Sequence, residues 1–114
     1  MPADHKDSNY GVTANLLLDH SPIPPLNVHR VRGENEPPME AERYSMEIRQ
    51  FVPMENGWPR FDLVMLGMGS DGHTASIFPH EIELLHSDKI CEVATHPKSG
   101  QKRISLTGKV INNA

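Results

Sequence analysis

The chain has 114 residues, of which 37% are hydrophobic and 10 are prolines, a size within the single-domain range but with a modest hydrophobic core. Its formal net charge is −4 and it contains no run of basic residues, which excludes the electrostatic footprint of a protein that binds nucleic acid or an anionic membrane. It has no apolar stretch long enough to cross a bilayer and no signal-peptide pattern after Met1, so we predict no membrane partner.

The first half of the chain predicts two helices, one short strand and one loop. A helix capped by Ser8 or Asn9 is predicted through about Leu18, because serine and asparagine side chains accept hydrogen bonds from first-turn amides. Residues 27 to 31 predict a short strand, and residues 54 to 60 predict a loop. Between them, residues 37 to 53 predict a second helix. It has a partly apolar stripe formed by Met39, Arg43, Met46 and residues 48 to 51.

The second half of the chain predicts a sheet. Residues 63 to 66, Leu-Val-Met-Leu, form a short continuous apolar run, as expected for a strand covered on both faces of a mostly parallel sheet. Residues 89 to 94 and 103 to 107 predict two further strands, separated by a turn at residues 97 to 100. The alternation of helices and strands predicts an α/β fold: a layered, Rossmann-like, mostly parallel sheet with helices on both faces.

A glycine-rich turn follows the apolar run and carries the candidate catalytic residues. Gly67, Gly69 and Gly72 let the backbone turn sharply and approach a ligand closely. The turn displays Asp71 and His73 just past the carboxyl end of the predicted strand, where ligands bind in α/β sheets. With an unperturbed pKa of about 6.5, His73 can act as a base near neutral pH. Asp71 can orient His73 or hold a substrate hydroxyl.

The residues after this turn favour a polar ligand but not a dinucleotide. Thr74 and Ser76 offer hydroxyl groups where a core-facing helix would offer apolar side chains. The stretch also matches the Gly-x-Gly-x-x-Gly pattern of dinucleotide sites. We reject that interpretation because Pro79 cuts short the helix whose N-terminus would receive the pyrophosphate. Asp71 would also bring a carboxylate to the position of the diphosphate, so we predict no cofactor.

Residues 67 to 79, Gly-Met-Gly-Ser-Asp-Gly-His-Thr-Ala-Ser-Ile-Phe-Pro, closely resemble the signature of 6-phosphogluconolactonases. These enzymes hydrolyse 6-phosphoglucono-1,5-lactone to 6-phosphogluconate in the oxidative pentose phosphate pathway. Further segments resemble the same family in the same order along the chain: residues 7 to 11, 19 to 30, 41 to 44, 103 to 107 and 110 to 114. The resemblance implies a hydrolase whose small-molecule partner is a sugar-phosphate lactone.

The resemblance also implies that residues 1 to 114 are the middle portion of a single lactonase-like domain. Members of the family are longer, and carry a phosphate-binding Gly-Gly-Ser/Thr loop and an Asp-Glu-Arg strand end that do not occur in this sequence. The resemblance also implies that the C-terminal end of the family's domain is not part of these 114 residues. We therefore expect the isolated chain to be inactive. Its oligomeric state cannot be predicted.

Two alternatives remain. Glucosamine-6-phosphate deaminases share the fold and an Asp-Gly-His turn, but their turn typically continues with Ile-Ala-Phe-Asn-Glu-Pro and so supplies a second carboxylate. This chain continues with Thr-Ala-Ser-Ile-Phe-Pro from residue 74 to residue 79 and lacks that glutamate, which favours the lactonase. The other alternative is a non-catalytic module that keeps the fold and binds a sugar phosphate.

The remaining polar residues have weaker assignments. Arg103 can clamp a phosphate, because a guanidinium pairs bidentately with phosphoryl oxygens. Asn9 can offer a substrate-side amide or simply cap a helix. No metal site is predicted, because the spacing of the later histidines fits no compact ligand pattern. The single cysteine, Cys91, cannot form an internal disulfide; it fits a buried strand position and a reducing cytoplasm.

Overall fold

The computed structural model describes residues 1 to 114, which form two compact units, residues 1 to 36 and residues 37 to 114. Each unit is described by itself. In chain order the elements of the first unit are α1 (Asn9–Leu16), η1 (Leu18–His20) and η2 (Pro25–Asn27). Those of the second unit are α2 (Pro37–Phe51), β1 (Met54–Glu55), β2 (Trp58–Pro59), η3 (Pro79–Leu85), β3 (Cys91–Thr95), β4 (Lys102–Leu106) and α3 (Gly108–Ile111).

The first unit confirms one predicted helix and contradicts one predicted strand. Ser8 caps α1, and its Oγ accepts a hydrogen bond from the Gly11 amide at 3.1 Å. The helix ends two residues before Leu18, and its leucines do not form a buried side, since Leu16 is 77% exposed. Residues 28 to 31 are not a strand: η2 occupies the start of the predicted range, and no other segment pairs with the rest.

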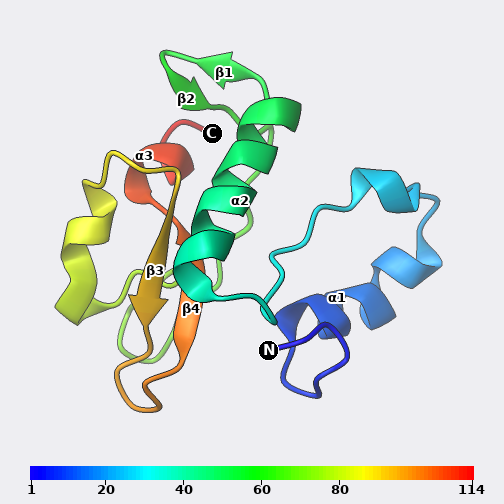
Figure 1. Cartoon of the computed structure of the whole chain (residues 1–114), viewed down its shortest axis with the longest axis horizontal. Helices are drawn as coiled ribbons and strands as arrows, with labels where there is room; N and C mark the ends of the chain where they lie inside the picture. The colour runs from blue at the N-terminus through cyan, green and yellow to red at the C-terminus, as the bar shows by residue number, and fades with distance from the viewer. The chain divides into compact units, whose positions relative to one another are not determined.

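In the second unit, α2 lies along the hairpin formed by β3 and β4 (Figure 1). The predicted helix is confirmed, but the predicted apolar stripe is partly wrong. Ala41 and Ile48 are buried, together with Glu40, which pairs with Arg43 at 2.5 Å. Met39 and Met46 are exposed. The face that packs on the hairpin is therefore set by small and branched residues. The core on this side consists of Ala41, Ile48, Ile90, Cys91 and Val110.

The two strands predicted near the C-terminus are confirmed, and they pair antiparallel with Cys91 opposite Leu106 and Thr95 opposite Lys102. The predicted turn between them contains Gly100 at φ +70°, a conformation that glycine adopts without strain. The α/β character of the unit is thus confirmed. Both strand pairs of the structure are antiparallel, so the parallel part of the predicted sheet is not among them.

Residues 54 to 60 are a small hairpin rather than the predicted loop. Met54 pairs with Pro59 and Glu55 with Trp58, and the turn residues Asn56 and Gly57 both have positive φ, at 56° and 80°. Asn-Gly is the preferred pair for such two-residue turns because both residues tolerate this conformation. The side-chain amide of Asn113 donates to the carbonyls of residues 55, 58 and 59, which ties this hairpin to the end of the chain.

The apolar run at residues 63 to 66 is not a strand in this structure. Leu63 is 73% exposed and Met65 is 81% exposed, so the prediction of a strand covered on both faces is wrong for this chain by itself. The physical reason is that a strand needs a partner for its backbone groups, and no segment of the chain pairs with this one.

The glycine turn leads into η3, a 3-10 helix where the sequence indicated a short helical turn. A second core cluster forms here from Ile77, Phe78, Leu84 and Ala94. It packs residues that follow the turn against β3, and so fixes the turn to the second unit. No helix of the structure has both the length and the apolar character needed to cross a membrane.

Candidate active site

The glycine turn closes on itself through backbone hydrogen bonds. The Gly69 amide donates to the His73 carbonyl at 2.9 Å, and the Gly72 amide donates to the Gly69 carbonyl at 3.0 Å. Gly72 has φ +82°, where a side chain would be strained. Ala75 also has a positive φ, 49°, so the turn holds one non-glycine residue in the left-handed region. Such backbone geometry is typical of a loop whose shape is fixed for function.

Asp71 and His73, predicted as the catalytic pair, are in direct contact. The Nδ1 atom of His73 hydrogen-bonds to Oδ1 of Asp71, and the same oxygen accepts the His73 amide at 3.1 Å. These bonds lower the pKa of the Asp71 carboxyl, the side-chain bond from His73 contributing most. Asp71 therefore stays a carboxylate at lower pH than usual, and it fixes which ring nitrogen of His73 faces it.

Gly69 has a role that the sequence did not reveal. A Cβ atom added there would lie 2.1 Å from Cε1 of His73 and 2.3 Å from its Nδ1. The imidazole therefore rests directly on the α-carbon of Gly69, and any side chain at this position would displace it. Gly67 and Gly72 have no atom within 4 Å of an added Cβ, so this requirement is specific to Gly69.

The ring of Phe78 also contacts the imidazole of His73, a role that the sequence did not indicate. This ring is fully buried, and its centroid lies 4.6 Å from that of His73. Two further imidazoles contact the same ring, His80 at 5.9 Å and His96 at 5.4 Å between centroids. Nothing in the sequence distinguishes Phe78 from an ordinary core aromatic, because its contacts come from the turn and from segments that follow it in the chain.

Arg103 lies close to this cluster, as its predicted role requires. Its Cζ atom is 5.9 Å from the centre of the Phe78 ring, and its Nε donates to Oε1 of Gln101 at 3.1 Å. The guanidinium and the His73 imidazole thus contact one aromatic ring, although 30 residues separate them in the sequence. The structure brings together Asp71, His73, Phe78 and Arg103.

The two residues predicted to offer hydroxyls to a ligand make contacts inside the protein. Oγ1 of Thr74 donates to the Gly67 carbonyl at 2.8 Å, which closes the turn. Ser76 is buried, and its amide donates to Oγ of Ser105 in β4 at 3.0 Å. These two residues therefore hold the turn in shape and attach it to the hairpin.

Asn9, the remaining candidate, is the first residue of α1 in the first unit, and the structure does not place it relative to the turn. Its carbonyl accepts a hydrogen bond from Oγ1 of Thr13 at 2.8 Å. No three histidine, cysteine, aspartate or glutamate side chains of the chain converge as a metal site would require.

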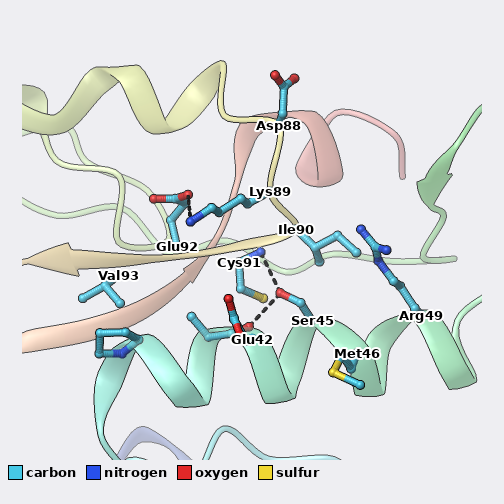
Figure 2. A pocket seen from close by; sticks show the side chains of 12 residues that line it. Glu42, Ser45, Met46, Arg49, Asp88, Lys89, Ile90, Cys91, Glu92 and Val93 are labelled. Carbon is cyan, nitrogen blue, oxygen red and sulfur yellow. Dashed lines mark hydrogen bonds and ion pairs between the residues drawn. The ribbon is translucent and has the colours of Figure 1, made fainter.

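A cavity of about 450 Å³ lies away from the turn, between α2 and the outer side of β3. Figure 2 shows Ser45 reaching from α2 to the backbone of Cys91, whose amide donates to Oγ of Ser45 at 3.2 Å. Burial raises the pKa of the Cys91 thiol to about 11, which keeps it protonated and unreactive near neutral pH. The cavity lining includes the carboxylates of Glu42, Asp88 and Glu92 but no histidine, so it lacks the paired carboxylate and imidazole of the glycine turn.

The fold and the turn define a class of protein: an α/β protein whose acid–base groups lie on a loop beside the sheet. Within this class, residues 1 to 114 match the family described as glucosamine-6-phosphate isomerases/6-phosphogluconolactonase. The chain belongs to this family, as the resemblance of the turn predicted.

Named relatives agree with this assignment. The chain is 52% identical over 114 residues to a 6-phosphogluconolactonase of Treponema pallidum, covering all of this chain and 47% of that protein. It is 47% identical over 114 residues to that of Haemophilus influenzae, again covering all of this chain and 47% of the relative. A crystal structure titled devB protein superposes with a TM-score of 0.95 at 45% identity, covering 100% of this chain and 48% of the other. The chain therefore spans about half the length of the curated relatives it matches.

Proposed function

We propose that this chain provides the catalytic turn of a 6-phosphogluconolactonase, which hydrolyses 6-phosphoglucono-1,5-lactone to 6-phosphogluconate. The observation that carries the proposal is the Asp71–His73 pair, whose imidazole contacts both the backbone of Gly69 and the ring of Phe78. The names of the two bacterial relatives support the lactonase over the deaminase branch of the family. The absence of a glutamate between residues 74 and 79 supports the same choice.

In the proposed reaction His73 is the general base. Because its Nδ1 faces Asp71, Nε2 is the nitrogen that accepts a proton from water. The water oxygen attacks the lactone carbonyl carbon and forms a tetrahedral intermediate. The bond from this carbon to the ring oxygen then breaks, and protonated His73 returns its proton to that oxygen, which leaves as a hydroxyl. The mechanism uses no metal and no covalent intermediate.

The developing oxyanion needs hydrogen-bond donors. The amides of Gly69 and Gly72 donate to carbonyls within the turn, so they are not available to the oxyanion. The amides of Gly67 and Ser70 make no hydrogen bond inside the chain. We assign them as the donors that the turn has available for the oxyanion.

The substrate phosphate is assigned to Arg103. Only its Nε is used in a hydrogen bond, to Gln101, so its two terminal nitrogens are available for a bidentate contact with phosphoryl oxygens. We keep Asn9 as a proposed substrate-side amide. The buried free Cys91 supports a reducing, cytoplasmic location.

The matched relatives are about twice as long as this chain, so we propose that the chain alone has little or no lactonase activity. The test is a chimera in which the chain replaces the matching segment of the Treponema pallidum relative. Its rates with freshly generated 6-phosphogluconolactone, corrected for spontaneous hydrolysis, are compared with ammonia release from glucosamine 6-phosphate. The isolated chain is assayed in parallel.

We expect the chimera to accelerate lactone opening and to release no ammonia. Ammonia release without lactone opening would replace the proposal with the deaminase. A folded chimera that binds a sugar phosphate but catalyses neither reaction would replace it with the non-catalytic module. A full rate from the isolated chain would show that the complete phosphate site, and not Arg103 alone, lies within these 114 residues.

A further inference from the structure

We propose that His96 is a second binding residue for the substrate phosphate, and that its Nε2–H donates to a phosphoryl oxygen beside the guanidinium of Arg103. This role rests on the proposed function, because it adds a residue to the phosphate site that was assigned there to Arg103 alone. Three features of the structure support it: the face of the β3–β4 hairpin on which His96 lies, its contact with Phe78, and the hydrogen bonds of its ring.

His96 and Arg103 lie on the same face of the β3–β4 hairpin. Arg103 is opposite Ala94, and the His96 amide donates to the Gln101 carbonyl at 2.9 Å, which continues the same register into the turn. Residues two apart in a strand point to the same face, so His96 projects on the side of Ala94 and Arg103. The two residues are diagonal neighbours across the hairpin, a separation of roughly 7–8 Å that long side chains can bridge.

This face of the hairpin packs on Phe78 and therefore borders the catalytic turn. Phe78 and Ala94 belong to one buried cluster. The centroid of the Phe78 ring lies 5.4 Å from that of His96, 4.6 Å from that of His73 and 5.9 Å from Cζ of Arg103. His73, His96 and Arg103 are all partly exposed, so a ligand can reach them. A small molecule whose carbonyl carbon lies at His73 can thus extend a phosphate toward the other two.

The hydrogen bonds of the His96 ring determine which of its nitrogens is a donor. Nδ1 accepts the Ser99 amide at 3.2 Å and lies 3.0 Å from Oγ of Ser99. Because a backbone amide can only donate, Nδ1 carries no proton, and the proton of the neutral ring is on Nε2. Nε2 has no hydrogen-bond partner within the chain. His96 therefore presents a free N–H donor whose orientation the turn fixes, next to the two terminal nitrogens of Arg103.

His80 contacts the same aromatic ring but presents the opposite chemistry. Its Nε2 lies 3.3 Å from Oε1 of Glu81, an arrangement in which Nε2 donates and the neutral ring leaves Nδ1 as an acceptor. A nitrogen lone pair and a neighbouring carboxylate both repel a phosphate. Of these two imidazoles on Phe78, His96 is therefore the one suited to hold the phosphate.

The experiment measures the affinity of the chimera and its variants for 6-phosphogluconate, the phosphorylated product, by titration calorimetry. His96→Phe keeps an aromatic ring against Phe78 and removes the N–H donor. We expect it to weaken binding by about tenfold, the loss of one hydrogen bond to a charged group. His96→Gln, whose side-chain amide can replace the Nε2 donor, should recover most of the affinity.

A matched control and a second substrate separate phosphate binding from a structural role. His80→Phe makes the same exchange on the same aromatic ring but removes no free donor, so it should not weaken the affinity. In the active chimera, His96→Phe should raise KM for 6-phosphogluconolactone by about tenfold and leave kcat unchanged. Its rate with glucono-1,5-lactone, which has no phosphate, should equal that of the parent chimera. A merely structural role of His96 would lower the rates with both lactones together.

Several results would overturn the role of His96. These are equal affinities of the parent chimera and His96→Phe for 6-phosphogluconate, equal losses in His96→Phe and His80→Phe, and a His96→Gln variant that binds no better than His96→Phe. A folded parent chimera that binds no 6-phosphogluconate would overturn it as well. A failed lactonase assay is a separate result, because the binding measurement requires no catalysis and still shows whether His96 holds the phosphate.

Discussion

A methyl group at position 69 would occupy the space that the His73 imidazole now fills. The added Cβ of Gly69→Ala would lie 2.1 Å from Cε1 of His73, where ordinary contact begins at 3.4 Å, so the ring must move by about 1 Å or more. Misplacement by about 1 Å can lower a rate about 10²-fold. We therefore expect kcat of the Gly69→Ala chimera to fall by about 10²-fold, while the fold is kept, because the clash lies on an exposed turn.

The assay is the initial rate of acid release from fresh lactone, with the spontaneous rate subtracted and thermal unfolding measured on the same samples. Gly57→Ala is the matched control, because Gly57 has φ +80° and no atom within 4 Å of an added Cβ. Its strain should cost about 1 kcal/mol of stability without changing the rate. A Gly69→Ala enzyme with the parent rate, or a Gly57→Ala enzyme that loses as much activity, would refute the role assigned to Gly69.

Three further predictions concern single side chains. In the chimera, His73→Gln should lower kcat by about 10²–10⁴-fold, the usual contribution of a positioned base; an unchanged rate would remove His73 from the mechanism. Arg103→Ala should act mainly on KM, and unchanged kinetics would leave it a surface charge. In the unfolded chain the Cys91 thiol has its ordinary pKa of 9.0, whereas burial in the folded chain raises this pKa to about 11. The free energy of unfolding therefore falls by about 2–3 kcal/mol as pH rises through this range. Cys91→Ala should abolish this fall, measured by urea unfolding at several pH values.

The elements that the sequence predicted correctly are those that short-range signals determine. Ser8 caps α1 as its side-chain chemistry indicates, and the β3–β4 hairpin has its predicted turn, because glycine at position 100 permits the positive φ that the turn requires. Asn56 and Gly57 are an equally local signal for a hairpin. The prediction of a loop at residues 54 to 60 did not use this signal and was wrong.

The predicted strand at residues 63 to 66 shows why strand pairing and the contacts of the site could not be predicted from the sequence. Its apolar pattern describes what would cover the segment, but pairing is a long-range property and depends on a partner strand. The same limit applies to the site. Asp71 and His73 are recognisable as residues, whereas the contacts of Phe78 with His73 and Arg103 arise only when β4 and the turn pack together.

The turn and the segment that precedes it differ in what they need from the rest of a protein. Three bonds internal to the turn, from the amides of Gly69 and Gly72 and the hydroxyl of Thr74, fix its shape, and the Ser76 amide attaches it to β4. None of these bonds involves residues 61 to 66. The geometry of Asp71 and His73 should therefore survive exposure of that segment, so the low activity expected of the isolated chain is a defect of substrate binding and not of the catalytic pair. For that reason the isolated chain and the chimera should give the same His73 ring chemical shifts by NMR at neutral pH, even though their lactonase rates differ; shifts that differ between the two would mean that the rest of the domain also organises the pair.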